Sequence, residues 1–431
     1  MRIVFYSTNS NIFDEDNFKI NVLPQNKESF LRFTESHPDD EFYCVTQKPG
    51  MFMPESDFNN HFIYLPKDAD TETFAGKIIS LNPDIVIAMT FWIEPYDWLP
   101  VSDALVAEKL NAQGINTICH SVQTGLICFD KWRTHNELSR LGFEVPEAVF
   151  CDHDLYFCAG SNREVLRNVY KESVFTQIKK LKLPLIIKDT TGLSSYGMTV
   201  VHTYGEAAGY LNSKRNNSNR LIEEFINGRQ FGLEIYGIPG AYNVLPPFEF
   251  SVNQYGITSP KQSVKYGPCE LPAVVKKMML KLAEGLGLCG AAQVDLILDE
   301  NGVWHIIEVN PRLSGMSFTY SAFCRLSVFE MMYRSCVKKE KLPKPDSFVM
   351  SLKLPLMTES QMKEIFELEG VQLLNQTNDL AAKQEREKGF CECIITGKEK
   401  AVIQKALTHF SELFPDDSPC FKKAMAITVS V

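Results

Sequence analysis

The chain has 431 residues, 45% hydrophobic and 23% charged, which is the composition of a soluble globular protein of two to four domains. Its formal net charge of −9 argues against a general nucleic-acid binder, and no apolar run is long enough to span a membrane. The first ten residues resemble a short strand rather than a signal peptide. The twelve cysteines include no CxxC pair, so we expect free thiols and a cytoplasmic location.

Residues 1–115 alternate short apolar runs with mixed, helix-like segments, which predicts an α/β domain. No glycine-rich fingerprint follows any of these strands, and this argues against a conventional NAD site. The aromatic stretch 90–100 is interpreted as a packed loop rather than a surface on which a ligand stacks.

Two lysines stand where phosphate groups could bind. Lys131 begins a predicted helix that ends near Gly142, and the positive end of a helix dipole suits a phosphate partner, although a surface lysine is the simpler interpretation. Lys188 ends a buried strand and precedes the small, polar loop 190–197, whose backbone N–H groups can fold over phosphates. The loop alone has little specificity, because many hairpins contain glycine and serine.

The segment 212–286 contains a further candidate pair. Residues 212–219 are interpreted as an exposed loop. Glu223 and Glu224 follow at a junction between two strands, where exposed backbone and a carboxylate can bind an adenine edge; solvated acids are the equal alternative. Residues 271–286 predict an amphipathic helix that packs on a core.

Residues 291–315 predict a β-hairpin. Two apolar runs, 294–298 and 303–309, flank Asn301 and Gly302, and this dipeptide is the strongest short indication of a two-residue hairpin turn. Such a turn pairs Glu300 with Val303 and thereby sets the register of the whole hairpin.

In that register, Asp295 lies opposite Glu308 and Gln293 lies opposite Asn310, all on one face. Facing carboxylates about 5 Å apart destabilise a sheet unless a cation neutralises them. Two carboxylates and an amide suit a hard ion such as Mg²⁺ that also takes oxygens from a substrate phosphate. The alternative is a solvated hairpin edge, which explains poorly why acids interrupt apolar strands at facing positions.

Two cysteines near the end of the chain, Cys391 and Cys393, share one face of a predicted strand. We interpret them as small packed hydrophobic residues rather than metal ligands, since no other His or Cys lies near them in sequence.

Over residues 115–335, the ordered set of these features resembles an ATP-grasp ligase. The resemblance is closest to the carboxylate–amine ligases, in the D-alanine–D-alanine ligase and L-amino-acid ligase branches. It implies ATP clamped between two α/β subdomains, a carboxylate phosphorylated to an acylphosphate, and attack by an amine to give an amide. The features are Lys131, Lys188 with its loop, the segment IEEFI at 222–226, Lys265, Asp295, Glu308, Asn310 and Arg312.

The same resemblance implies a role for each matching residue. The implied metal ligands, for Mg²⁺ with Mn²⁺ as an alternative, are Asp295, Glu308 and Asn310. The implied catalytic residues are Arg312 and Lys265. The implied ATP-binding residues are Lys131, Lys188, Ser194, Ser195, Gly197, Glu223, Glu224, Ile226 and Glu234.

This sequence departs from the family pattern at several positions. Asp189 stands where proline is frequent, which we interpret as harmless. Gln230 stands where a ribose-binding glutamate is usual, so Glu234 on the same strand face is the expected substitute. Gln293 replaces the arginine of D-alanine–D-alanine ligases. Arg312 instead resembles the arginine of L-amino-acid ligases, which favours an amino-acid or peptide ligase.

The expected architecture is an α/β ATP-grasp fold in four parts. They are a Rossmann-like domain at 1–115, subdomains at 116–200 and 201–338, and a small α+β domain at 339–431. The last part resembles the extra domain of L-amino-acid ligases and biotin carboxylases. The expected partners are a small-molecule carboxylate and an amine, with neither nucleic acid nor membrane; a homodimer is left open.

Two other functions compete with this prediction. A biotin-dependent carboxylase shares the clamp and the C-terminal part, but its substrate motif carries further acidic and histidine residues that 312–320 lack. A catalytically silent ATP-binding module is favoured by Gln230 and Gln293, and opposed by the intact set of acids and lysines.

Overall fold

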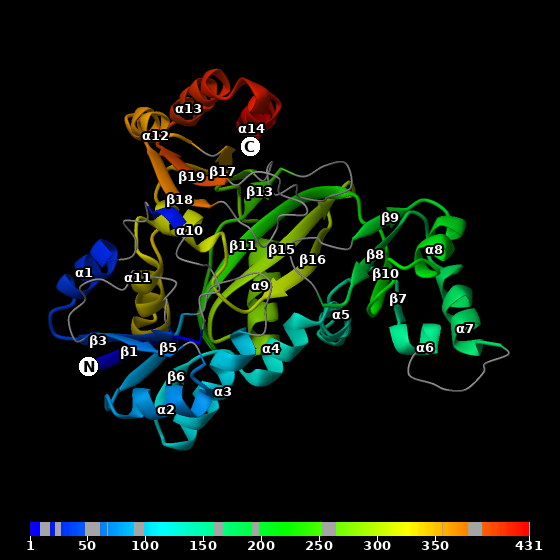
Figure 1. Cartoon of the computed structure of the whole chain (residues 1–431), viewed down its shortest axis with the longest axis horizontal. Helices are drawn as coiled ribbons and strands as arrows, with labels where there is room; N and C mark the ends of the chain where they lie inside the picture. The colour runs from blue at the N-terminus through cyan, green and yellow to red at the C-terminus, as the bar shows by residue number, and fades with distance from the viewer. Residues whose placement is uncertain are drawn as a thin grey trace.

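The computed structural model describes residues 1–8, 18–21, 27–47, 61–66, 68–89, 99–158, 167–191, 198–251, 264–355, 357–377 and 390–430. These residues form sheets of five, four and ten strands with helices packed around them (Figure 1). Within these ranges, no helix is both long and apolar enough to cross a membrane.

The N-terminal sheet has the order β4-β3-β1-β5-β6, and its strands are all parallel. Helices α2 (Thr71–Ile79) and α3 (Leu99–Ala112) pack against each other and cover a core with Phe74 and Val106. Parallel strands joined by helices confirm the predicted Rossmann-like part. The strands are β1 (Arg2–Ser7), β3 (Glu41–Gln47), β4 (Phe62–Leu65), β5 (Ile85–Ala88) and β6 (Asn116–Ile118).

The four-stranded sheet is antiparallel in the order β7-β10-β8-β9 and lies at the right of Figure 1. It carries Lys188 on β8 and Glu223 on β10. Its strands are β7 (Ala148–Cys151), β8 (Leu185–Asp189), β9 (Thr199–Val201) and β10 (Arg220–Glu224). Its helices are α6 (His153–Phe157), α7 (Val169–Ile178) and α8 (Tyr204–Leu211).

Residues 212–219 form a loop, as predicted, but the loop is not exposed throughout. Asn216 is only 3% exposed, and its side chain bonds to Leu211 and to the guanidinium of Arg220. Arg220 is 1% exposed and forms an ion pair with Asp189 on the neighbouring strand. The loop therefore encloses a buried charge, because a guanidinium without such partners would be costly to bury.

The large sheet continues across the predicted boundary at 338/339, because β14 pairs with β17. Strands of the C-terminal part thus extend the sheet that carries the predicted metal ligands. The four-part division itself stays a prediction. The strands are β2 (Phe18–Asn21), β11 (Gly228–Ile238), β12 (Ala241–Val244), β13 (Phe248–Phe250), β14 (Val264–Gly267), β15 (Gly290–Asp299), β16 (Trp304–Asn310), β17 (Phe348–Pro355), β18 (Val371–Thr377) and β19 (Phe390–Gly397).

Helices cover one face of this sheet at both ends. The predicted helix 271–286 is α9 (Ala273–Leu286), which shares a core with α4 (Val122–Phe129) and α5 (Lys131–Arg140). At the C-terminal end the cover consists of α12 (Glu359–Phe366), α13 (Lys400–Leu413) and α14 (Ser418–Ser430). Cys391 and Cys393 are fully buried there as free thiols, so their interpretation as packed residues is confirmed.

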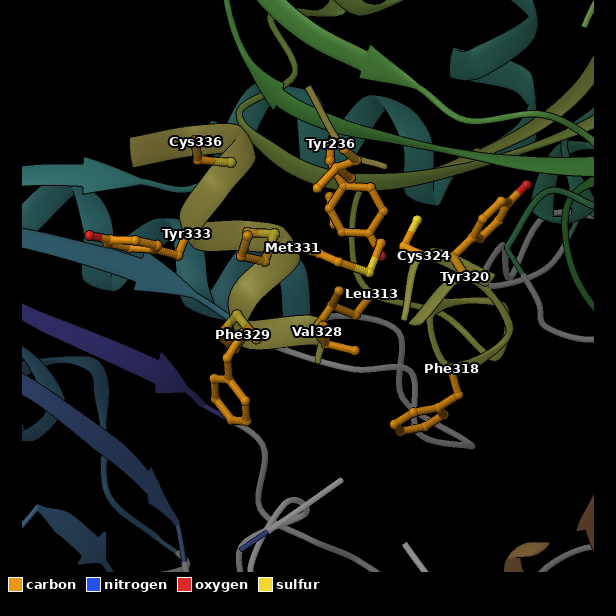
Figure 2. Packing of buried hydrophobic residues seen from close by; sticks show 14 of the residues in the cluster. Tyr236, Leu313, Phe318, Tyr320, Cys324, Val328, Phe329, Met331, Tyr333 and Cys336 are labelled. Carbon is orange, nitrogen blue, oxygen red and sulfur yellow. The ribbon is translucent and has the colours of Figure 1, made fainter. Parts of the chain in front are cut away.

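The other face of the sheet packs against α10 (Ser317–Cys324), α11 (Val328–Met332) and the π-helix Tyr333–Lys338. Figure 2 shows Tyr236 of β11 among the side chains of these helices. Phe329 of α11 contacts Phe5 and Phe30 of the N-terminal part at ring distances of 5.1 and 5.0 Å. This core therefore joins the N-terminal domain to the large sheet.

Candidate active site

The hairpin turn of the candidate site has three residues in its loop rather than the predicted two. The amide of Asp299 bonds to the carbonyl of Val303 at 2.9 Å, so these residues close the loop and Glu300 does not pair with Val303. The Asp299 carboxylate also accepts bonds from the amides of Asn301 and Val303. Gly302 adopts φ +80°, a conformation that glycine reaches without strain.

A β-bulge at Ile307 restores the predicted register deeper in the hairpin. Near the turn, Leu298 pairs with Trp304, but beyond the bulge Asp295 pairs with Glu308. The extra residue in the loop shifts the pairing by one residue, and the extra residue at the bulge shifts it back. The predicted opposition of Asp295 to Glu308 is therefore confirmed, as is that of Gln293 to Asn310, although the predicted turn is wrong.

The Glu308 charge perturbs the buried carboxyl group of Asp295. Burial raises the pKa of Asp295, and the charge of Glu308 raises it further, to about 7. The side-chain amide of Gln293 donates to Asp295 Oδ1 at 2.6 Å and opposes this rise. Gln293 thus holds the Asp295 carboxylate on the predicted metal face.

Lys131 lies where the two halves of the candidate site meet. Asp130 caps helix α5 by accepting from the amide of Arg133, and this places Lys131 in the first turn. Its amide donates to Thr190 at the end of β8, at 2.7 Å, and its ammonium lies 3.4 Å from Glu308 Oε1. A lysine from the helix start therefore reaches the predicted metal face.

Lys188 forms a buried charge cluster with Glu223 and His135. Lys188 Nζ lies 2.5 Å from Glu223 Oε2, and His135 Nδ1 lies 3.4 Å from Glu223 Oε1. Burial alone would raise the pKa of Glu223, but the charge of Lys188 and the bond to His135 outweigh it and lower the value to about 2. In this structure the Glu223 carboxylate is thus held by Lys188 and His135.

These side chains line one cleft between the four-stranded sheet and the large sheet. The backbone N–H of Ile226, at the predicted adenine hinge, has no acceptor among the residues that the structure describes. The aliphatic walls suit the faces of a purine ring, and the charged end suits phosphates. The lining includes Lys131, His135, Lys188, Met198, Glu223, Glu224, Ile226, Gln230, Ile297, Ile306 and Glu308.

The structure places Glu234 away from the cleft, so its predicted ribose contact is wrong. Glu234 is fully buried, and its carboxylate accepts bonds from the hydroxyls of Tyr236, Ser314 and Ser317 at 2.6–2.8 Å. Burial raises its pKa to about 7 despite these donors. Glu234 anchors the chain that follows β16, whereas Gln230 is the residue of this strand face that lines the cleft.

The two predicted catalytic residues lie beside the metal face. Arg312 is 8% exposed, and its Nη2 donates to Asn310 Oδ1 at 3.0 Å. Lys265 lies on β14, where burial lowers its pKa while the charges of Glu392, Asp295 and Glu234 oppose that effect. The charges of Lys265 and Arg312 both oppose the rise in the pKa of Asp295.

The residue types at this face fit a magnesium ion that shares its coordination with phosphate. Asp295, Glu308 and Asn310 supply oxygens only, and their spacing follows from the register of one hairpin. No group of three or more His, Cys, Asp or Glu side chains in the described part of the chain is placed to hold a metal by itself. Phosphate oxygens would have to complete the set.

The predicted lid is not among the described residues, and one residue of the cleft was not predicted. Ser194, Ser195 and Gly197, the predicted lid, lie outside the described residues. His135 was missed, although the sequence contained an indication: it follows Lys131 by four residues and so shares a face of the same helix.

A wider cavity of about 1180 Å³ lies elsewhere, between α11, α13 and the C-terminal strands. Its charges largely compensate one another. Glu330 bonds to Arg334 and lies 2.8 Å from His37, so it is engaged within the protein. The convergence of unlike charges from separate elements marks the cleft, rather than this cavity, as the candidate site.

The part of the chain that contains the cleft residues matches a known family. Residues 128–316 match the ATP-grasp domain family. The chain is 27% identical to the D-alanine–D-alanine ligase of Nitrosospira multiformis over 215 residues, which are 48% of this chain and 64% of that ligase. The chain therefore spans less than two thirds of this relative.

Two solved structures resemble the whole chain. The L-amino acid ligase from Bacillus licheniformis aligns with a TM-score of 0.62 and 14% identity, over 95% of this chain and 97% of that one. A biotin carboxylase from Campylobacter jejuni aligns with a TM-score of 0.59 and 15% identity, over 94% and 90%. At these identities the likeness concerns the fold, and the predicted fold class is confirmed.

Proposed function

The chain carries an ATP-grasp domain, and from this premise we propose that it is an ATP-dependent ligase that joins a carboxylate, in our view an amino acid, to an amine. The observation that carries the proposal is the meeting of two lysines at one cleft with Glu308, which pairs with Asp295 across the hairpin. Lys131 approaches Glu308, and Lys188 lies on the opposing sheet. Phosphoryl transfer needs such positioning and charge neutralisation more than covalent help from the protein.

In this proposal Lys131 and Lys188 bind the phosphates of ATP, and the backbone at Glu224 and Ile226 reads adenine. Asp295, Glu308 and Asn310 hold Mg²⁺, or Mn²⁺ in its place. The metal ion, when bound, neutralises charge on the phosphate oxygens. Lys131 lies 3.4 Å from Glu308 and still has N–H groups for a phosphate, because an ammonium has three donors.

The reaction has two balanced steps. An oxygen of the substrate carboxylate attacks the γ-phosphorus, a new O–P bond forms, and ADP leaves with the electrons of the broken bridge bond. The amine nitrogen then attacks the acyl carbon, a C–N bond forms, and the C–O bond to phosphate breaks. Inorganic phosphate leaves, and the amine gives up its protons to phosphate and water. Arg312 and Lys265 lie beside the charge that develops on these oxygens.

The test is the release of ADP and phosphate in the presence of candidate acids, with and without amines. Turnover that requires both an amino acid and an amine supports the proposal. Dependence on bicarbonate instead would favour a carboxylase. Absence of turnover with any acid would favour the silent ATP-binding module, for which Gln230 in the cleft is the main argument.

A matched pair of variants tests the metal assignment. Glu308→Ala should abolish turnover without unfolding the protein, because it removes a metal ligand from a half-exposed position. Glu300→Ala, at the exposed tip of the same hairpin, should retain activity. Full activity of the Glu308 variant would refute the assignment.

A further inference from the structure

One face of the large sheet leads from the metal ligands toward the C-terminal part. Asp295 on β15 pairs with Gly232 on β11, and Gly232 pairs with Phe248 on β13. Two residues further along β13, Phe250 pairs with Lys265 on β14. Because side chains alternate between faces, all five residues share a face. Lys265 Nζ lies 5.8 Å from the centre of the Phe250 ring.

The same face continues onto the C-terminal strands. Lys265 pairs with Ser351 on β17, and two residues later Lys353 pairs with Glu392 on β19. Neighbouring strands are about 4.8 Å apart and successive residues about 3.4 Å, so Glu392, two strands across and two residues along, stands roughly 12 Å from Lys265 between Cα atoms. Both side chains are long and extend from the same face of the sheet.

The packing of the alternate residues fixes this orientation. Tyr266, Leu352 and Cys393 point to the opposite face and belong to the core under α12, α13 and α14. Their neighbours in sequence must therefore point away from those helices. Lys265, Lys353 and Glu392 are accordingly only partly buried.

The charge of Glu392 acts on Lys265, although no ion pair joins the two side chains. Of the charges that act on the pKa of Lys265, that of Glu392 is the strongest. In the described part of the chain, the Glu392 carboxylate has neither a hydrogen bond nor an ion pair. A partly buried carboxylate of this kind is costly unless a cation or a donor reaches it. The carboxylate and the ammonium therefore lie on one face of the sheet, the face that also carries Asp295.

We propose that Glu392 binds the ammonium group of the amine substrate and positions it beside the reacting carboxyl group next to Lys265. The inference rests on the proposed ligase function and adds a residue from the C-terminal part to its substrate site. It assigns the acceptor to a primary amine that is a cation in solution. Glu392 positions the ammonium, which gives up one proton to water or phosphate before its nitrogen attacks. The neutral amine then follows the second step above and loses its other proton as the amide forms.

The role of Glu392 is tested by comparing the KM values for an uncharged acceptor and for a positively charged acceptor. Hydroxylamine is uncharged at neutral pH and captures an acylphosphate as a hydroxamate without any need for an ammonium site. In Glu392→Gln, the KM for glycine or another amino-acid acceptor should rise at least tenfold, while the KM for hydroxylamine and that for ATP change less than twofold. Glu392→Asp should recover part of the amino-acid affinity.

Glu367→Gln is the matched control. It makes the same chemical change at an exposed residue just after α12, on the helical side of the sheet, and should leave every KM unchanged. An unaltered KM for the amino acid in Glu392→Gln would overturn the inference, and so would equal losses with both acceptors. If the unaltered protein consumes ATP with no acid and no acceptor, the proposed function itself fails, which is a different result.

Discussion

Replacing Glu308 with glutamine is expected to stabilise the metal-free protein at pH 8 while it abolishes turnover. The reason is the pairing of Glu308 with Asp295 across two strands. Burial and the charge of Glu308 raise the pKa of Asp295 from 3.8 to about 7, which corresponds to about 4 kcal/mol for charging Asp295. Because the folded-state pKa is raised, the stability that Asp295 contributes is complete below about pH 4 and is lost as the pH rises through 7.

The share of Glu308 follows from Coulomb's law. Two charges about 5 Å apart at an effective dielectric constant of 20 repel by about 3 kcal/mol. The Glu308 side chain is 32% exposed, and screening by solvent reduces this to about 1–2 kcal/mol. The variant also loses the ion pair with Lys131, which is worth less than about 1 kcal/mol. The free energy of unfolding of Glu308→Gln should therefore be about 1 kcal/mol higher than that of the unaltered protein at pH 8.

The assay is the thermal unfolding midpoint in EDTA at pH 5 and pH 8, with Glu300→Gln as the control at the exposed hairpin tip. At pH 8 the midpoint of Glu308→Gln should rise by about 1–3 °C. At pH 5 it should not rise, because Asp295 already carries its proton. A midpoint that falls at pH 8, or an equal rise at both pH values, would refute the reasoning.

Three further outcomes are expected. Arg312→Lys should lower kcat by about 10- to 100-fold in steady-state assays, because the ammonium cannot replace a bidentate guanidinium; unchanged kcat would contradict this role. Arg220→Met should destabilise the protein by about 3 kcal/mol in urea unfolding, and adding Asp189→Leu should restore part of the loss if the unpaired carboxylate is the cause. For Glu234, whose pKa is raised from 4.5 to about 7, stability should fall by up to about 3 kcal/mol between pH 5 and 8; Glu234→Gln should flatten that profile, and an unchanged profile would disprove it.

The hairpin shows which structural features can be predicted from local sequence patterns. Alternation in the strands and the Asn-Gly dipeptide were enough to place Asp295 opposite Glu308. The sequence alone could not show that the loop has a third residue or that Ile307 forms a bulge, because both depend on hydrogen bonds between strands. The acids meet as predicted because these two differences cancel.

Glu234 illustrates the opposite case. Its position on the same strand face as Gln230 was read correctly, since that depends only on a period of two. Whether a residue on that face meets ligand or core depends on what covers it. Ser314 and Ser317 arrive from beyond β16 and enclose Glu234, and strand periodicity contains no information about them.

By itself, the sequence determined the kinds of element, the acids of one hairpin face and the chain order of lysines and carboxylates. These are properties of neighbouring residues. Only the tertiary structure decided that His135 joins Glu223, that Arg220 is buried against Asp189, and that Glu392 on a C-terminal strand shares a sheet face with Lys265. The physical reason is that burial and electrostatic environment depend on which elements pack together, and sequence-distant elements meet only in the folded chain.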